Sequence, residues 1–82
     1  MNDPDLEEIL AFFREYFDVQ NVKPDTELMT SRVLDSMKIV ELLEFLKQRF
    51  DVSIPPPLIS AEGLGSPERI LKSVKTLAAS KT

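Results

Sequence analysis

Residues 33–55 read VLDSMKIVELLEFLKQRFDVSIP, and this stretch predicts a helix over residues 36–50. At helical spacing its apolar residues gather in one sector, which is the pattern of a helix with one buried face. Proline ends the helix by residue 55, because its ring clashes with the preceding turn and it has no backbone N–H. The predicted buried residues are Ile39, Leu42, Leu43, Leu46 and Phe50.

The other side of this helix carries a mixture of apolar and polar side chains, namely Met37, Val40, Glu41, Glu44 and Gln48. Phe45 fits neither group. It either widens the buried face or contacts the neighbouring loop.

Two further helices flank this one. The first covers residues 4–18, because Asp3 is a suitable N-cap and Pro4 suits the first helical position. The last begins at Ser66, which is an N-cap followed by Pro67. The first helix buries Leu6, Ile9, Leu10, Phe13 and Phe17, and the last buries Ile70, Leu71, Val74, Leu77 and Ala78.

Residues 19–35 show no sustained periodicity, and Pro24-Asp25 marks a turn. A connection this long in a compact domain is expected to be functional or packed onto the core. Its apolar residues, Val22, Leu28, Met29, Val33 and Leu34, are suited to packing there. A short helical turn is predicted over residues 58–63, with Gly63 and Gly65 ending it.

These patterns define the fold class as all-α, with no strand pattern and no internal repeat. We expect a small four-helix bundle of three main helices and one short helix, with a long first loop. The 82 residues allow a single domain, residues 1–82, near the lower size limit for unaided stability.

Composition excludes several functions. The chain has no cysteine and no histidine, which removes disulfides, thiolate metal sites and histidine-dependent catalysis, so we expect no metal site and no enzyme. The net charge of −4 argues against nucleic acid as a partner. No apolar run reaches the ~20 residues of a membrane span, and the start, MNDPDLEE, lacks the features of a signal peptide. We therefore expect a cytoplasmic monomer.

Asp35 and Ser36 form the one candidate site of modification. Asp35 is a natural N-cap, which places Ser36 at the first helical position, where a partner enzyme can reach it. A phosphoester on Ser36 would lie near free backbone N–H groups and the positive end of the helix dipole. Because Asp-Ser is a common dipeptide, the alternative from the residues alone is a capped helix with no further role.

The wider stretch resembles the acyl carrier protein family, whose members carry a phosphopantetheine group. Its matching parts are Asp35-Ser36-Met37, Val40-Glu41-Leu42, Phe50-Asp51 and Ile54-Pro55, and the order of helices agrees over nearly the whole chain. The resemblance implies that Ser36 receives 4′-phosphopantetheine from coenzyme A through a phosphopantetheinyl transferase. The arm would then carry acyl or aminoacyl groups as thioesters.

The resemblance also implies partners and a surface for them. A loading ligase and downstream synthases of fatty acid, polyketide or nonribosomal peptide biosynthesis would dock on the second helix through Met37, Val40, Glu41 and Glu44. Apolar anchors supply contact area and carboxylates steer basic partners. Glu41 and Glu44 are also neighbours at i, i+3 spacing, but an exposed pair is a poor acid–base catalyst.

Residues 33–37 are closer to carriers of the peptide-synthetase and D-alanyl types, which indicates a specialised, free-standing member of the family. Lys38, Lys47 and Arg49 make the second helix neutral, and with Arg32 they would weaken binding to general partners. The bulk of Phe13, Phe17, Phe45 and Phe50 predicts a filled interior and a short or polar cargo held outside it. The alternative function is an unmodified helical adaptor; a small hydrolase or transferase is disfavoured by the missing side chains.

Overall fold

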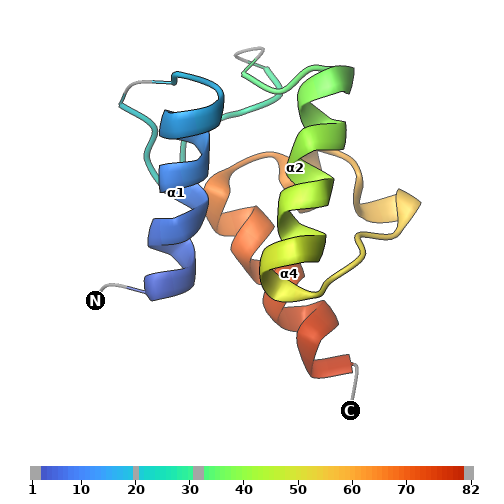
Figure 1. Ribbon diagram of the computed structural model, residues 1–82. Coiled ribbons are helices and arrows are strands. Elements are labelled where there is room, and N and C mark those ends of the chain that lie inside the picture. The colour runs from blue at the N-terminus through green and yellow to red at the C-terminus, as the bar shows by residue number, and fades with distance from the viewer. Residues whose placement is uncertain (1–2, 20, 31–32, 81–82) are drawn as a thin grey trace.

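The structure, a computed structural model, describes residues 3–19, 21–30 and 33–80. Its α-helices are α1 (Pro4–Tyr16), α2 (Ser36–Phe50), α3 (Ala61–Leu64) and α4 (Pro67–Ser80), and a single 3-10 turn, η1, covers Pro56–Leu58. The described ranges contain no strand. The predicted all-α fold, with three main helices, one short helix and a long first loop, is confirmed (Figure 1).

The start of α1 agrees with the sequence, but its end does not. The Asp3 carboxylate caps the helix by accepting a hydrogen bond from the Asp5 N–H at 3.0 Å. The helix was expected to reach residue 18, yet its last residue is Tyr16. Asp18 adopts the left-handed conformation at φ 53°, and the Val19 N–H bonds back to the Phe13 carbonyl at 3.2 Å. This turn ends the helix two residues before the predicted end. The spacing of apolar residues, on which the prediction rested, gives no signal for such a turn.

Helix α2 has the predicted bounds. Asp35 caps its first turn, and Asp51 ends it in the left-handed conformation at φ 56° while its N–H bonds to the Lys47 carbonyl at 3.0 Å. Leu42 and Leu46 are fully buried, as predicted. The other three residues of the predicted face, Ile39, Leu43 and Phe50, are partly buried against the core.

The short helical turn predicted over residues 58–63 is wrong in position. The triple proline instead supports η1, where prolines without N–H groups fill the first two positions, and α3 follows it over Ala61–Leu64. Gly63 lies inside α3 and does not end it. A Cβ on Gly63 would approach the Leu58 carbonyl oxygen to 2.1 Å, so glycine is needed here for close packing of α3 on η1.

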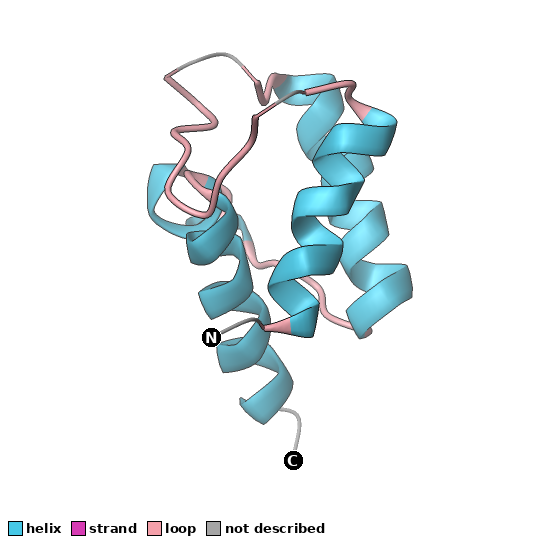
Figure 2. Cartoon of the chain, turned by 90° about the vertical axis from the view of Figure 1, so that its left-hand side faces the viewer, coloured by secondary structure: helices cyan, strands magenta, loops and turns pink. Residues whose placement is uncertain are grey.

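Helix α4 is the central packing element, because it contacts α1, α2 and α3 (Figures 1 and 2). Ser66 caps it as predicted, accepting a hydrogen bond from the Arg69 N–H at 3.3 Å. The buried core combines residues of all four helices with three residues of the long loop and Val52. Its largest fully buried side chains include Phe13, Ile9, Leu28, Leu42, Leu46, Leu64 and Ile70. Ala78, which was predicted to be buried, is exposed.

The connection between α1 and α2 is drawn as a loop in Figure 2, and its described apolar residues pack onto the core, as the sequence predicted. Leu28 is fully buried, and its N–H donates to the Gly65 carbonyl at 2.8 Å. The Glu68 N–H donates to the Pro24 carbonyl at 3.0 Å, and the Leu34 N–H donates to the Leu28 carbonyl at 2.9 Å. These bonds attach the loop to the α3–α4 junction and fix the start of α2.

Two ion pairs between side chains connect the beginning of α1 to the rest of the bundle. Lys75 of α4 pairs with Asp3, and Arg49 of α2 pairs with Glu8. The hydrogen bond from Lys75 holds the pKa of the Asp3 carboxyl below its ordinary value, and the same bond raises the pKa of Lys75. The basic side chains of both pairs are more than half exposed and screened by solvent, so the pairs orient α1 more than they stabilise the fold.

The first prediction concerns the buried anchor of the loop. Replacing Leu28 with alanine removes apolar contacts and leaves a cavity, so the free energy of unfolding should fall by about 3 kcal/mol. That is a large part of the about 5–15 kcal/mol that stabilises a typical domain. Urea unfolding followed by circular dichroism measures the loss. The exposed Val40→Ala provides the control and should change the stability by less than about 0.5 kcal/mol. Similar losses in both variants would contradict this account of the loop.

Candidate functional site

The candidate modification site lies at the first turn of α2. Ser36 is the first residue of this helix, and it is exposed to solvent. Among the described residues, no backbone carbonyl or side chain accepts a hydrogen bond from the N–H groups of Ser36 or Met37. An exposed hydroxyl beside two free N–H groups suits a phosphoester, because these donors and the helix dipole favour negative charge.

Asp35 sets the position of Ser36. Its carboxylate accepts a hydrogen bond from the Lys38 N–H at 2.9 Å, and its carbonyl accepts the Ile39 N–H at 2.8 Å. The preceding residue, Leu34, is buried in the core, which holds the chain in place just before the helix. The predicted N-cap role of Asp35 is therefore observed, and no hydrogen bond joins its carboxylate to the hydroxyl of Ser36, which is also a described residue.

Two exposed apolar side chains follow Ser36 on α2. Met37 is 75% exposed and Val40 is 59% exposed. Since burying apolar area favours association, such residues at the end of a helix next to an exposed hydroxyl are suited to docking. Glu41 and Glu44 are exposed beside them, as the helical spacing predicted.

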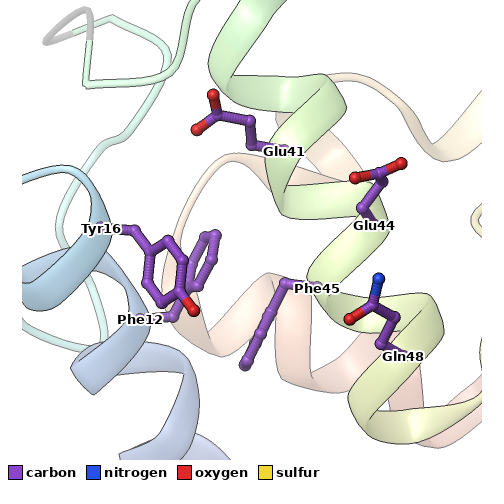
Figure 3. Close-up of a pocket in the computed structure, with 6 residues that line it drawn as sticks. All are labelled: Phe12, Tyr16, Glu41, Glu44, Phe45 and Gln48. Atoms are coloured by element: carbon purple, nitrogen blue, oxygen red, sulfur yellow. The ribbon is translucent and has the colours of Figure 1, made fainter.

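Glu41 and Glu44 also line a groove between α1 and α2, of about 320 Å³ and open to solvent (Figure 3). We call this hollow the α1–α2 groove; its lining residues are Phe12, Tyr16, Glu41, Glu44, Phe45 and Gln48. The Phe12 ring stacks on Phe45 with 4.2 Å between ring centroids and on Tyr16 with 4.8 Å. The groove thus combines three stacked aromatic rings with two carboxylates.

The α1 side of this groove was not predicted from the sequence. Phe12 was not placed on the buried face of α1, although it is 4% exposed, and Tyr16 was not assigned a role. The two residues stand at i, i+4 spacing, and this spacing is the signal that could have paired them. Phe45, which fitted neither face of α2, points to α1 and not to the long loop.

Within the described ranges, no group of three or more acidic residues is arranged to hold a metal ion. The helices of those ranges include none that is long and apolar enough to cross a membrane. Arg32, which was expected to weaken binding to general partners, lies outside the described residues.

Comparison with known proteins supports the resemblance seen in the sequence. The D-alanyl carrier proteins of two strains of Lactobacillus delbrueckii subsp. bulgaricus are each 32% identical to this chain over 53 residues. The aligned residues make up 65% of this chain and 66% of each relative, so the match spans slightly less than two thirds of the relatives' length. No protein-family model matches the chain.

The chain is therefore distantly similar to D-alanyl carrier protein, which is a member of the acyl carrier protein family. This similarity confirms the family resemblance predicted from residues 33–55.

The second prediction tests the cap that positions Ser36. Asp35→Ala removes the acceptor of the Lys38 N–H, so the free energy of unfolding should fall by about 1 kcal/mol. Asp35→Asn should recover most of this loss, because asparagine caps helices about as well as aspartate does. Thermal and urea unfolding measure both variants. Equal losses in the two variants would show that the charge of Asp35, and not its capping bond, stabilises this end of α2.

Proposed function

We propose that this chain is a carrier protein in which the Ser36 hydroxyl is modified with 4′-phosphopantetheine. The observation that supports this proposal most directly is the exposed Ser36 at the first position of α2, held there by the Asp35 cap. The similarity to D-alanyl carrier protein supports it independently of this geometry. In this proposal, residues 1–82 act as one carrier domain.

The proposed modification is a phosphoryl-group transfer. The Ser36 oxygen forms a bond to the pantetheine-bearing phosphorus of coenzyme A, the pyrophosphate bond breaks, and 3′,5′-ADP leaves. Among the described residues, none forms a hydrogen bond with the Ser36 hydroxyl, and the carboxylate of Asp35 accepts the Lys38 N–H. A transferase and its metal ion would therefore take the hydroxyl proton and bind the leaving group.

The modified protein would hold acyl or aminoacyl groups as thioesters on the sulfur of the arm. This chain lacks both cysteine and histidine, so a prosthetic arm supplies chemistry that its own side chains do not have. D-alanyl is one cargo that the named relatives support. A loading ligase and a downstream acceptor enzyme would be its partners besides the transferase.

We propose Met37 and Val40 as the apolar centre of the surface that these enzymes bind, with Glu41 and Glu44 at its side. Both apolar residues are exposed and lie within the first turns of α2, next to Ser36. The same exposure supports the second candidate function, an unmodified adaptor that binds a protein partner through α2. The two functions differ in whether the Ser36 hydroxyl is modified.

The third prediction separates these functions. Incubation with coenzyme A, magnesium and a broad-specificity phosphopantetheinyl transferase should increase the intact mass by one phosphopantetheine group. Ser36→Ala should show no increase, whereas Ser60→Ala, which alters a partly buried serine outside α2, should react like the unaltered protein. An unchanged mass in the unaltered protein, or an equal increase in Ser36→Ala, would rule out the carrier function.

The fourth prediction concerns the docking surface. The double variant Met37→Ala, Val40→Ala removes exposed apolar area without changing the core, so its fold should persist while the initial rate of modification falls several-fold. Mass spectrometry over time measures the rate, and circular dichroism checks the fold. Lys47→Ala and Gln48→Ala together change the far end of α2 and serve as the control. A rate unaffected by the first pair would remove Met37 and Val40 from the transferase interface.

A further inference from the structure

The α1–α2 groove has a chemical character that the docking surface does not explain. Its three aromatic rings form a continuous stack from Tyr16 through Phe12 to Phe45. Tyr16 is 72% exposed although it is stacked, so one face of the groove is a large aromatic surface in contact with solvent. Glu41 and Glu44 line the groove from α2, and Figure 3 shows the Glu41 carboxylate extending toward α1 while the Glu44 carboxylate extends away from the rings.

These two carboxylates are not neutralised by the bases of α2. Lys47 pairs with Asp51 at 3.5 Å, and Arg49 pairs with Glu8. Lys38 lies over the Phe17 ring, with its Nζ 5.7 Å from the ring centroid. Among the described residues, neither Glu41 nor Glu44 forms an ion pair, and the lining of the groove includes no basic residue.

Aromatic faces and free carboxylates attract the same kind of ligand. The negative face of an aromatic ring attracts an ammonium group, and a carboxylate pairs with it. The groove is therefore complementary to a cation that carries a short apolar portion. It is not suited to a carboxylate or phosphate, which the two glutamates would repel.

The groove is within reach of the Ser36 arm. Glu41 and Glu44 lie five and eight residues after Ser36 on one continuous helix, which places them about 8 and 12 Å along its axis. The exposed side chains of Met37 and Val40 lie between Ser36 and these glutamates. An extended phosphopantetheine arm is longer than this path, so its end can enter the groove.

We propose that the α1–α2 groove holds the ammonium group of a short aminoacyl cargo carried on the arm of Ser36. This inference rests on the proposed function, since it needs the arm, and it assigns the free carrier a binding site for the end of its own cargo. Glu41 pairs with the ammonium group while the stacked rings contact the carbon skeleton, and the charge of Glu44 at the rim of the groove adds to the attraction. The cargo then rests outside the packed core.

The fifth prediction compares two cargoes that differ in one charge. A phosphopantetheinyl transferase loads the protein with alanyl or propionyl phosphopantetheine from the matching coenzyme A analogues, in which a stable amide replaces the thioester and from which 3′,5′-ADP leaves. Propionyl has the carbon skeleton of alanyl without the ammonium group. Intact mass confirms loading, and nuclear magnetic resonance spectra of the labelled protein then compare the two forms. We expect additional shifts of the Tyr16 ring and of the Glu41, Glu44 and Gln48 amides with alanyl only.

Substitution of the two glutamates tests whether these shifts arise from binding in the groove. Glu41→Gln and Glu44→Gln keep the size of each side chain but remove its charge. Glu41→Gln should reduce the alanyl-specific shifts by more than half, and Glu44→Gln, at the rim of the groove, should reduce them less. Glu62→Gln removes an exposed charge of α3, which does not line this groove, and should leave the shifts unchanged.

Failure of the carrier function and failure of the ammonium site would give different results. A protein that accepts no arm contradicts the carrier function itself. If the protein is loaded but shows equal shifts with alanyl and propionyl, only the ammonium site is contradicted. The groove would then bind the arm itself or a basic side chain of a partner.

Discussion

The position of Ser36 at the start of α2 depends on how the long first loop is attached to the core. Leu28 provides the attachment, because its side chain is fully buried and its N–H bonds to the Gly65 carbonyl at the α3–α4 junction. The Leu28 carbonyl in turn accepts the Leu34 N–H, immediately before the Asp35 cap. A single buried residue thus links the packing of α3 and α4 to the first turn of α2, where Ser36 is exposed.

A second constraint acts between α1 and α2. The stacking of Phe12 on Phe45 joins these two helices through large, flat side chains. Rings of this size leave space at the surface beside them, and polar side chains of α2 border that space. The α1–α2 groove is therefore a consequence of aromatic packing between the two helices, and the ion pair of Arg49 with Glu8 connects the same helices near the start of α1.

Most of the fold could be predicted from the sequence, because its caps and apolar spacing are local signals. Asp3, Asp35 and Ser66 each cap the helix that they were expected to begin, and α2 has its predicted bounds. The end of α1 and the position of the short helix could not be predicted, because they depend on a left-handed Asp18 and on the approach of Gly63 to Leu58. The groove could not be predicted from the sequence for a related reason. It is formed by residues of two helices, and single-helix periodicity does not pair them. The role of Ser36 stays a prediction that geometry and similarity support.

The exposed aromatic ring at the groove has a practical consequence for spectroscopy. Tyr16 is the single tyrosine of the chain, and the chain has no tryptophan. Emission excited at the long-wavelength edge of the near-ultraviolet band therefore arises from one ring, which stacks on Phe12 and faces solvent at the mouth of the groove. The unlabelled protein carries its own optical reporter at this position, without the need to introduce a fluorophore.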